Sequence, residues 1–207
     1  MKIYLKFALA ILLMVSFTDV QAQIKPGYIF GLNLSTITLK TKGISSRPET
    51  PAGIHFGGFL EIPVIGNFTL QPGLLLSAKG SNFKIDSTEF SLAPVYLEIP
   101  VIAVYSFGSD VVKVSLFAGP YFACGIGGYK IESEGAFRYL SFGSGENKDL
   151  KPFDFGLNFG AGVNIKGFMI SAQYGIGLLN ILPSTTTDSE IKNKVIGISI
   201  SSLFAIK

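Results

Sequence analysis

Hydrophobic and polar residues alternate with a period of two along most of the chain after residue 22. The clearest stretch is 153–166, where Phe153, Phe155 and Leu157 begin a run of apolar residues at every second position. Asp154, Asn158 and several glycines occupy the positions between them. Strict alternation of this kind predicts a β-strand with one apolar face and one polar face.

The same pattern recurs along the chain. It predicts eight strands, at 27–38, 53–63, 68–79, 92–106, 111–124, 153–166, 168–179 and 196–204. A strand tilted near 45° crosses a bilayer with about 9 to 11 residues, so these segments are long enough to span a membrane.

The predicted links between the strands alternate in length. Short links fall at 64–67, 108–110 and 166–167, and longer polar links fall at 39–52, 80–91, 125–152 and 180–193. Short periplasmic turns and longer extracellular loops are typical of an outer-membrane barrel. The pattern therefore predicts an all-β fold, an eight-stranded antiparallel up-and-down transmembrane β-barrel with both termini on the periplasmic side.

The composition of the two faces supports a membrane barrel over a soluble one. The polar face carries mostly Gly, Ser and Asn, which suit a narrow interior, so the apolar face is expected to meet lipid. Lipid offers no partner for backbone amides, so the sheet has to close on itself. Aromatic residues are expected near both rims: Tyr28, Phe30, Phe68, Tyr105, Phe107, Phe168 and Phe204 near one, and Phe56, Phe83, Phe90, Tyr129 and Phe153 near the other.

Apolar residues interrupt the polar face in two strands. Leu74, Leu75 and Leu76 break the alternation, and Ile102 and Val104 have inward parity, so part of the lumen is expected to be apolar. An eight-stranded barrel is filled by side chains or holds one small ligand. A water-filled pore is therefore not expected.

The first residues have the features of an export signal. Lys2 and Lys6 precede an apolar run at 7–17, and Val20-Gln21-Ala22 resembles a cleavage site. Asp19 closes the run too early for a membrane anchor, which needs about 20 apolar residues. We predict a signal peptide at 1–22 and a barrel domain at 23–207.

Charge and cysteine content exclude several classes of partner. The chain has 17 basic and 14 acidic side chains, mixed along its length, and no basic stripe that could follow a row of phosphates, so nucleic acid is not expected as a partner. Cys124 is the only cysteine, so no internal disulfide is possible. Its apolar surroundings favour a small buried residue over a reactive thiol.

The sequence contains little that predicts catalysis. His55 is the only histidine, so no histidine cluster can bind zinc, and neither a metal site nor a cofactor is expected. A Ser/His/acid arrangement is conceivable in a small barrel, but no serine lies in a nucleophile-elbow pattern. We predict that the protein is not an enzyme.

Charged residues on the polar face form the candidate site. Glu61, Lys79, Glu98 and Lys113 all have inward parity, and Gln71 and Gln173 could add hydrogen bonds. Buried charges are costly unless they are paired, which predicts a lumenal ion-pair network. A plug that holds the barrel together is the favoured interpretation, and a ligand or selectivity site is the alternative.

Several segments together resemble the PorT-like outer-membrane β-barrel domain along nearly the whole mature chain. The likeness is carried by LQPGLLLSAKGS at 70–81, VYLEIPV at 95–101, AGPY at 118–121, FDFGLNFGAGV at 153–163 and QYGIGLLN at 173–180. The resemblance implies an outer-membrane barrel in a diderm bacterium. One member type of the family assists protein secretion.

The long loops are the other candidate for a specific activity, because loops on rigid scaffolds often carry function. The 125–152 segment mixes charged residues with aromatic ones and could dock a protein or a glycan: Glu132, Glu134, Arg138, Glu146, Lys148, Phe137, Tyr139 and Phe142. We expect outer-membrane lipid as the surrounding partner and a structural or interaction role in the envelope. A binding, transport-accessory or secretion-accessory barrel is the alternative, and a lipid-modifying enzyme is a third.

Overall fold

The computed structural model describes residues 24–40, 52–85, 88–109, 111–132, 136–145, 147–183 and 190–204. The predicted signal peptide lies outside the described residues. Within the described residues, no helix is long and apolar enough to cross a membrane.

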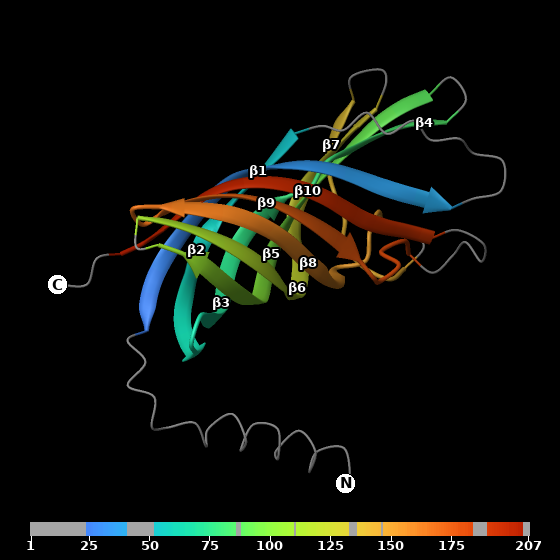
Figure 1. Cartoon of the computed structure of the whole chain (residues 1–207). Helices are drawn as coiled ribbons and strands as arrows, with labels where there is room; N and C mark the ends of the chain where they lie inside the picture. The colour runs from blue at the N-terminus through green and yellow to red at the C-terminus, as the bar shows by residue number, and fades with distance from the viewer. Residues whose placement is uncertain are drawn as a thin grey trace, which may run out of the picture.

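The described chain is built from antiparallel strands. They are β1 (Lys25–Lys40), β2 (Ala52–Ile65), β3 (Phe68–Ala78), β4 (Ser81–Ile85), β5 (Thr88–Gly108), β6 (Val112–Glu132), β7 (Phe137–Tyr139), β8 (Phe153–Ile165), β9 (Phe168–Gly177) and β10 (Glu190–Leu203). Eight of them follow the order β5-β3-β2-β1-β10-β9-β8-β6, and pairing of β5 with β6 closes this ring (Figure 1). The predicted eight-stranded antiparallel barrel is confirmed.

Two short strands lie outside the ring. β4 pairs with the beginning of β5, and β7 pairs with the end of β6. The links predicted at 80–91 and 125–152 are therefore partly strand, and β5 and β6 are each 21 residues long. Five and three residues are too few to show a convincing alternation in the sequence. Both short strands lie toward the end of the barrel opposite the C-terminal end (Figure 1).

Tight turns join the strands at one end, which we call the turn end. β2 and β3 are joined by Gly66–Asn67, and β8 and β9 by Lys166–Gly167. Lys166 has a φ of 52° and Gly167 a φ of 93°, the left-handed pair that a type I′ hairpin turn requires. The start of β1 and the end of β10 lie here too, where the Phe204 amide donates to the Pro26 carbonyl over 2.8 Å. We call the opposite end the loop end.

The two faces of the sheet differ as predicted. Large apolar side chains point outward, and Phe30, Leu116 and Ile198 are each more than half exposed. Such a continuous apolar surface would be unfavourable in water and is stable in lipid. The three leucines that seemed to break the alternation obey it, because Leu74 is 53% exposed and Leu75 is 8% exposed.

Aromatic residues form contacts near the turn end. The rings of Tyr28 and Phe204 are 5.3 Å apart, and those of Phe68 and Tyr105 are 4.7 Å apart. These pairs project from the outer face on strands β1, β3 and β5 and from the residue after β10. Amphipathic rings of this kind favour the membrane–water interface.

Candidate functional site in the barrel lumen

A buried ion-pair cluster fills the lumen in its loop half. The Lys79 Nζ atom lies 3.0 Å from Glu98 Oε2 and 3.8 Å from Asp154 Oδ2. It also lies over the rings of Tyr96 and Tyr121, at 5.1 and 4.4 Å from their centroids. All five residues are almost completely buried. One ammonium therefore faces two carboxylates and two aromatic rings inside the barrel.

Neutral donors also bind the two carboxylates, although Asp154 Oδ1 has no described hydrogen-bond partner. The Tyr121 hydroxyl donates to Asp154 Oδ2 over 2.9 Å, and the Asn193 amide donates to the same oxygen over 2.8 Å. The Asn158 amide donates to Glu98 Oε1 over 3.5 Å. These contacts join residues of β5, β6, β8 and β10 to Lys79, which directly follows β3. The cluster thus links five strands of the barrel.

The six predicted lumenal residues do not form one network. Lys79 and Glu98 pair in the loop half, while the Gln71 amide donates to Glu61 Oε2 over 3.0 Å nearer the turn end. No ion pair joins Lys113 to any described residue, and Gln173 lies partly buried in the wall without a described hydrogen bond. Parity places all six residues on the polar face, but they lie at different heights along the barrel axis.

His55 belongs to a second polar cluster, which sequence reasoning missed. Its Nδ1 lies 2.8 Å from Asn33 Oδ1 and its Nε2 lies 2.8 Å from Ser199 Oγ. The Asn33 amide nitrogen donates to Ser77 Oγ and to the Ala78 carbonyl, each over 3.1 Å. Because that nitrogen is occupied, Asn33 Oδ1 accepts from Nδ1–H, and Nε2 accepts from the Ser199 hydroxyl.

This Ser199–His55–Asn33 trio has the connectivity of a nucleophile, a base and an orienting residue. It has no space for a substrate, however. Each of the three residues is at most 2% exposed, and Ser199 lines neither of the lumenal cavities described below. A nucleophile has to lie about 3 Å from a reacting carbon, which this burial prevents. The trio instead joins β1, β2 and β10, where the first and last strands meet.

Gly31 makes the trio possible. It is paired with His55 on β2 and with Ser199 on β10, so the imidazole has to pass over it to reach the serine. A Cβ atom at Gly31 would lie 2.5 Å from His55 Cε1 and would also meet the Ile198 carbonyl. The interaction spans 144 positions in sequence, and only the strand register reveals it.

Two adjoining cavities occupy the turn half of the lumen. A polar vestibule of about 490 Å³ opens at the turn end and is lined by Lys25, Glu61 and Lys113 among other residues. A smaller cavity of about 60 Å³ lies beside it and is lined mainly by apolar side chains, including Leu75 and Ile102. The lumen is therefore filled in its loop half and hollow in its turn half.

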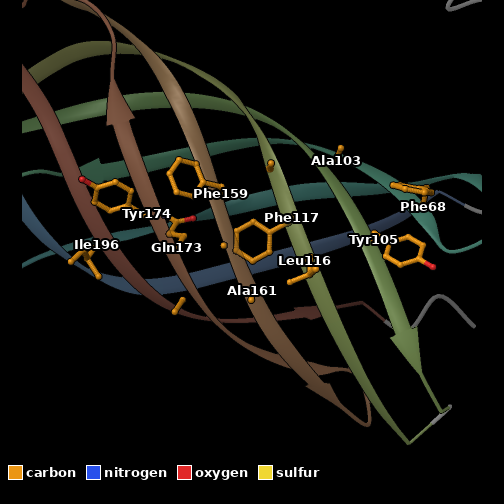
Figure 2. A pocket seen from close by; sticks show the side chains of 13 residues that line it. Phe68, Ala103, Tyr105, Leu116, Phe117, Phe159, Ala161, Gln173, Tyr174 and Ile196 are labelled. Carbon is orange, nitrogen blue, oxygen red and sulfur yellow. The ribbon is translucent and has the colours of Figure 1, made fainter.

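The outer surface also has a hollow. Its volume is about 820 Å³. It forms because several of its lining residues are alanines, whereas the residues around them are large (Figure 2). Phe159 and Tyr174 lie side by side on one flank, with ring centroids 5.5 Å apart, and Phe68 and Tyr105 lie on the other (Figure 2). The lining is almost wholly apolar and most of its residues have outward parity, so this hollow belongs to the lipid-facing surface.

No metal site is evident in the described part of the chain. No three His, Cys, Asp or Glu side chains there come together in a way that could hold an ion. Cys124 is partly buried, and its thiol lies 4.0 Å from the Gly125 carbonyl oxygen.

Known structures with a similar arrangement are small outer-membrane proteins. Neisserial surface protein A is 14% identical, with 86% of this chain and 97% of that chain covered and a TM-score of 0.45. The attachment invasion locus protein Ail of Yersinia pestis is 14% identical, with 86% and 98% covered and a TM-score of 0.40. The outer membrane enzyme PagL is 10% identical, with 84% and 98% covered and a TM-score of 0.41.

Sequence comparison identifies the family. No curated protein matches the chain. The sequence model described as the outer membrane protein beta-barrel domain matches residues 21–182, which is well over half of the chain. The chain therefore belongs to the outer membrane protein beta-barrel domain family and is a protein of the outer membrane.

Proposed function

We propose that this protein is a closed, non-conducting barrel with a structural or interaction role in the cell envelope. The observation that carries the proposal is the filled loop half of the lumen, where Lys79, Glu98 and Asp154 are almost completely buried. A pore would need these charges to be hydrated. Here they pair with one another inside the protein instead, and only Asp154 Oδ1 among the carboxylate oxygens has no described hydrogen-bond partner.

An apolar cap supports closure at the loop end. Leu150 and Ile181 are fully buried and pack with Leu92, Leu140 and Ile191. Backbone hydrogen bonds hold the cap, since the Lys151 amide donates to the Ile181 carbonyl and the Ile181 amide donates to the Ile191 carbonyl. Phe142 packs against this cap and edge-on against Tyr96, with 6.0 Å between ring centroids, and so links the cap to the ion-pair cluster.

Conductance measurements test closure directly. We expect the refolded protein to give no stable current steps in planar lipid bilayers between pH 5 and pH 8, under conditions in which a general porin conducts. Insertion is checked separately by protease protection of the barrel. Reproducible steps from inserted wild-type protein would refute the proposal.

An enzymatic role has less support, because Ser199, the nucleophile of the Ser199–His55–Asn33 trio, is 2% exposed and lines neither cavity. We expect cells that carry His55→Gln to have the same envelope lipids as wild type on mass analysis. Loss of a deacylated or otherwise modified lipid in the variant would instead favour the lipid-modifying enzyme.

We also propose that the chain belongs to a narrower group within this family, the PorT-like barrels. The five segments that resemble PorT-like barrels, from 70–81 to 173–180, support membership of that narrower group. They favour a secretion-accessory role as the second candidate function. Unchanged secretion of envelope cargo after deletion of the gene would exclude that second candidate and leave the closed-barrel proposal intact.

The interaction surface that we propose is an aromatic cluster on the β6–β7 hairpin. Tyr129, Phe137 and Tyr139 are exposed, and their ring centroids are 4.7, 5.5 and 6.4 Å apart. Arg138 binds Asp149 through both guanidinium nitrogens, at 3.0 and 2.5 Å, and holds the hairpin against the following loop.

The cluster lies beyond the apolar band of the barrel. Leu116 pairs with Tyr105 near the turn end, and Tyr129 follows Leu116 by 13 residues (129 − 116). At about 3.3 Å per residue and a tilt of about 40°, this separation corresponds to about 33 Å along the axis. The apolar band of such barrels is about 25 Å tall. The cluster therefore supports contact with a partner outside the hydrocarbon region.

Site-specific crosslinking tests this surface. We expect a photo-crosslinking residue at Tyr139 to give a discrete protein or glycan adduct in intact cells. The same residue at Leu116, which is 52% exposed on the lipid-facing surface, is the matched control and should give lipid adducts alone. Identical adduct patterns from the two positions would exclude the hairpin as the interaction surface.

A further inference from the structure

Two lysines face each other across the mouth of the vestibule. Lys25 begins β1 and Lys113 lies near the start of β6. In the closed ring, β1 and β6 are four strands apart in either direction, so these lysines lie on opposite sides of the barrel. Both are exposed and both line the same cavity.

The vestibule has an excess of positive charge. Neither lysine forms an ion pair with any described residue, and Glu61 is the only acidic residue among the described residues that line the cavity. Two lysines and one glutamate give a formal charge of 2 − 1 = +1. Glu61 is itself engaged by the Gln71 amide over 3.0 Å. A cavity with this lining favours an anion.

Neutral donors are also available at the mouth. Asn164 Oδ1 accepts a hydrogen bond from the Gly167 amide over 3.0 Å, which leaves the Asn164 amide nitrogen as a donor. Thr69 and Ser201 add hydroxyl groups to the lining. An anionic group held between the lysines would thus find hydrogen-bond donors on several strands.

The smaller cavity is mainly apolar, in contrast to the polar vestibule. Its apolar lining includes Ile29, Phe59, Leu75, Ile102 and Phe117. It adjoins the vestibule, because Phe59, Gln71, Met169 and Ser201 line both cavities. Its far end meets His55 and Glu98, whose polar groups are already engaged in the loop-half clusters.

The volume of this cavity limits what it holds. One water-sized group needs about 10 to 15 Å³ on this measure, so about 60 Å³ accommodates about four to six such groups. This is room for a short aliphatic chain and is too little for the two full acyl chains of a phospholipid.

We propose that the turn half of the lumen binds a small single-chain anionic amphiphile from the periplasm. Its carboxylate lies between Lys25 and Lys113, and its short aliphatic tail enters the cavity lined by Leu75 and Ile102. This proposal rests on the proposed closure, because a filled loop half makes the turn half a cavity that is open at one end only. The two ideas remain separable, because conductance tests closure and ligand binding tests this site.

Hexanoate is the probe. The full mature protein is placed in lipid nanodiscs, and binding of carbon-13-labelled hexanoate is measured by saturation-transfer NMR with empty nanodiscs as the blank. We expect saturable binding that tightens about fourfold per methylene from acetate to hexanoate, the gain that burying each methylene provides. The gain should level off near six carbons. Hexanol, which has the tail without the charge, should bind at least tenfold more weakly.

Variants separate this site from nonspecific binding. The double variant Lys25→Gln/Lys113→Gln should weaken hexanoate binding at least tenfold. Lys166→Asn is the matched control, because Lys166 is another turn-end lysine that does not line the vestibule, and asparagine tolerates its φ of 52°. Equal binding by the double variant and the control would overturn the proposal. Equal affinity for acetate and hexanoate, or for hexanol and hexanoate, would also overturn it.

Discussion

Replacing Lys79 with methionine should strongly destabilise the barrel. The substitution nearly preserves side-chain volume and removes the ammonium that lies 3.0 Å from Glu98 and 3.8 Å from Asp154. Two buried carboxylates then remain without a cation. Breaking a buried pair on one side costs about 3–5 kcal/mol, because the remaining charge is neither hydrated nor paired.

The size of the loss follows from the same geometry. Without the ammonium, Asp154 keeps only the neutral donors on Tyr121 and Asn193, and Glu98 keeps only the Asn158 amide at 3.5 Å. Neutral donors do not replace a cation between two buried carboxylates, so the loss should fall within this range.

The assay is urea unfolding in lipid vesicles. The chain has no tryptophan, so the transition is followed by circular dichroism and by gel mobility. Lys113→Met is the matched control, since Lys113 is exposed and forms no described ion pair. That control should stay within about 0.5 kcal/mol of wild type. Equal losses in the two variants would refute the reasoning.

Two further predictions concern Gly31 and the β6–β7 hairpin. Gly31→Ala should cost about 1–3 kcal/mol in the same assay, because its Cβ would displace His55, whereas Gly127→Ala, with open space around it, should be nearly neutral. A neutral Gly31→Ala would show that the His55 trio does not hold the strands. Burial raises the pKa of Asp149, but hydrogen bonds from Arg138 and the Ser141 amide outweigh it, so the pKa is lowered overall. The ionised form therefore stabilises the hairpin above the ordinary aspartate pKa, and this contribution is lost only as pH falls through the lowered value. Hydrogen exchange of residues 137–150 should stay protected at pH 5 and lose protection below about pH 4; loss already at pH 5 would contradict this assignment.

The alternation of polar and apolar residues was enough to predict the barrel and its lipid-facing surface. The prediction succeeds because every strand has one face in lipid and one in the lumen. Side chains therefore alternate between the two faces, and the direction of each follows from its position in the strand. The tight turn at Lys166–Gly167 follows equally well from a glycine between two alternating runs. Parity also placed Lys79 and Glu98 on the inner face.

Contacts within the lumen depend on strand register, which alternation does not determine. The Gln71–Glu61 pair and the Lys79–Glu98 pair share a parity but differ in height, so one predicted network became two separate groups. Asp154 has the right parity too, and only the pairing of β8 with β6 brings it beside Tyr121. The cap was missed for a different reason, because Leu150 and Ile181 occur in segments interpreted as solvated loops.

The buried side-chain clusters and the accessible volume lie in different halves of this barrel. The loop half contains the buried ion pairs, the His55 trio and the apolar cap, which together join strands that are distant in sequence. The turn half contains both cavities, and its exposed lysines contribute little to stability because surface charges without partners are nearly neutral to folding. Substitutions at Lys25 and Lys113 should therefore change ligand binding while the fold persists. A barrel arranged this way can vary its turn-end mouth without weakening the contacts that fill its loop half.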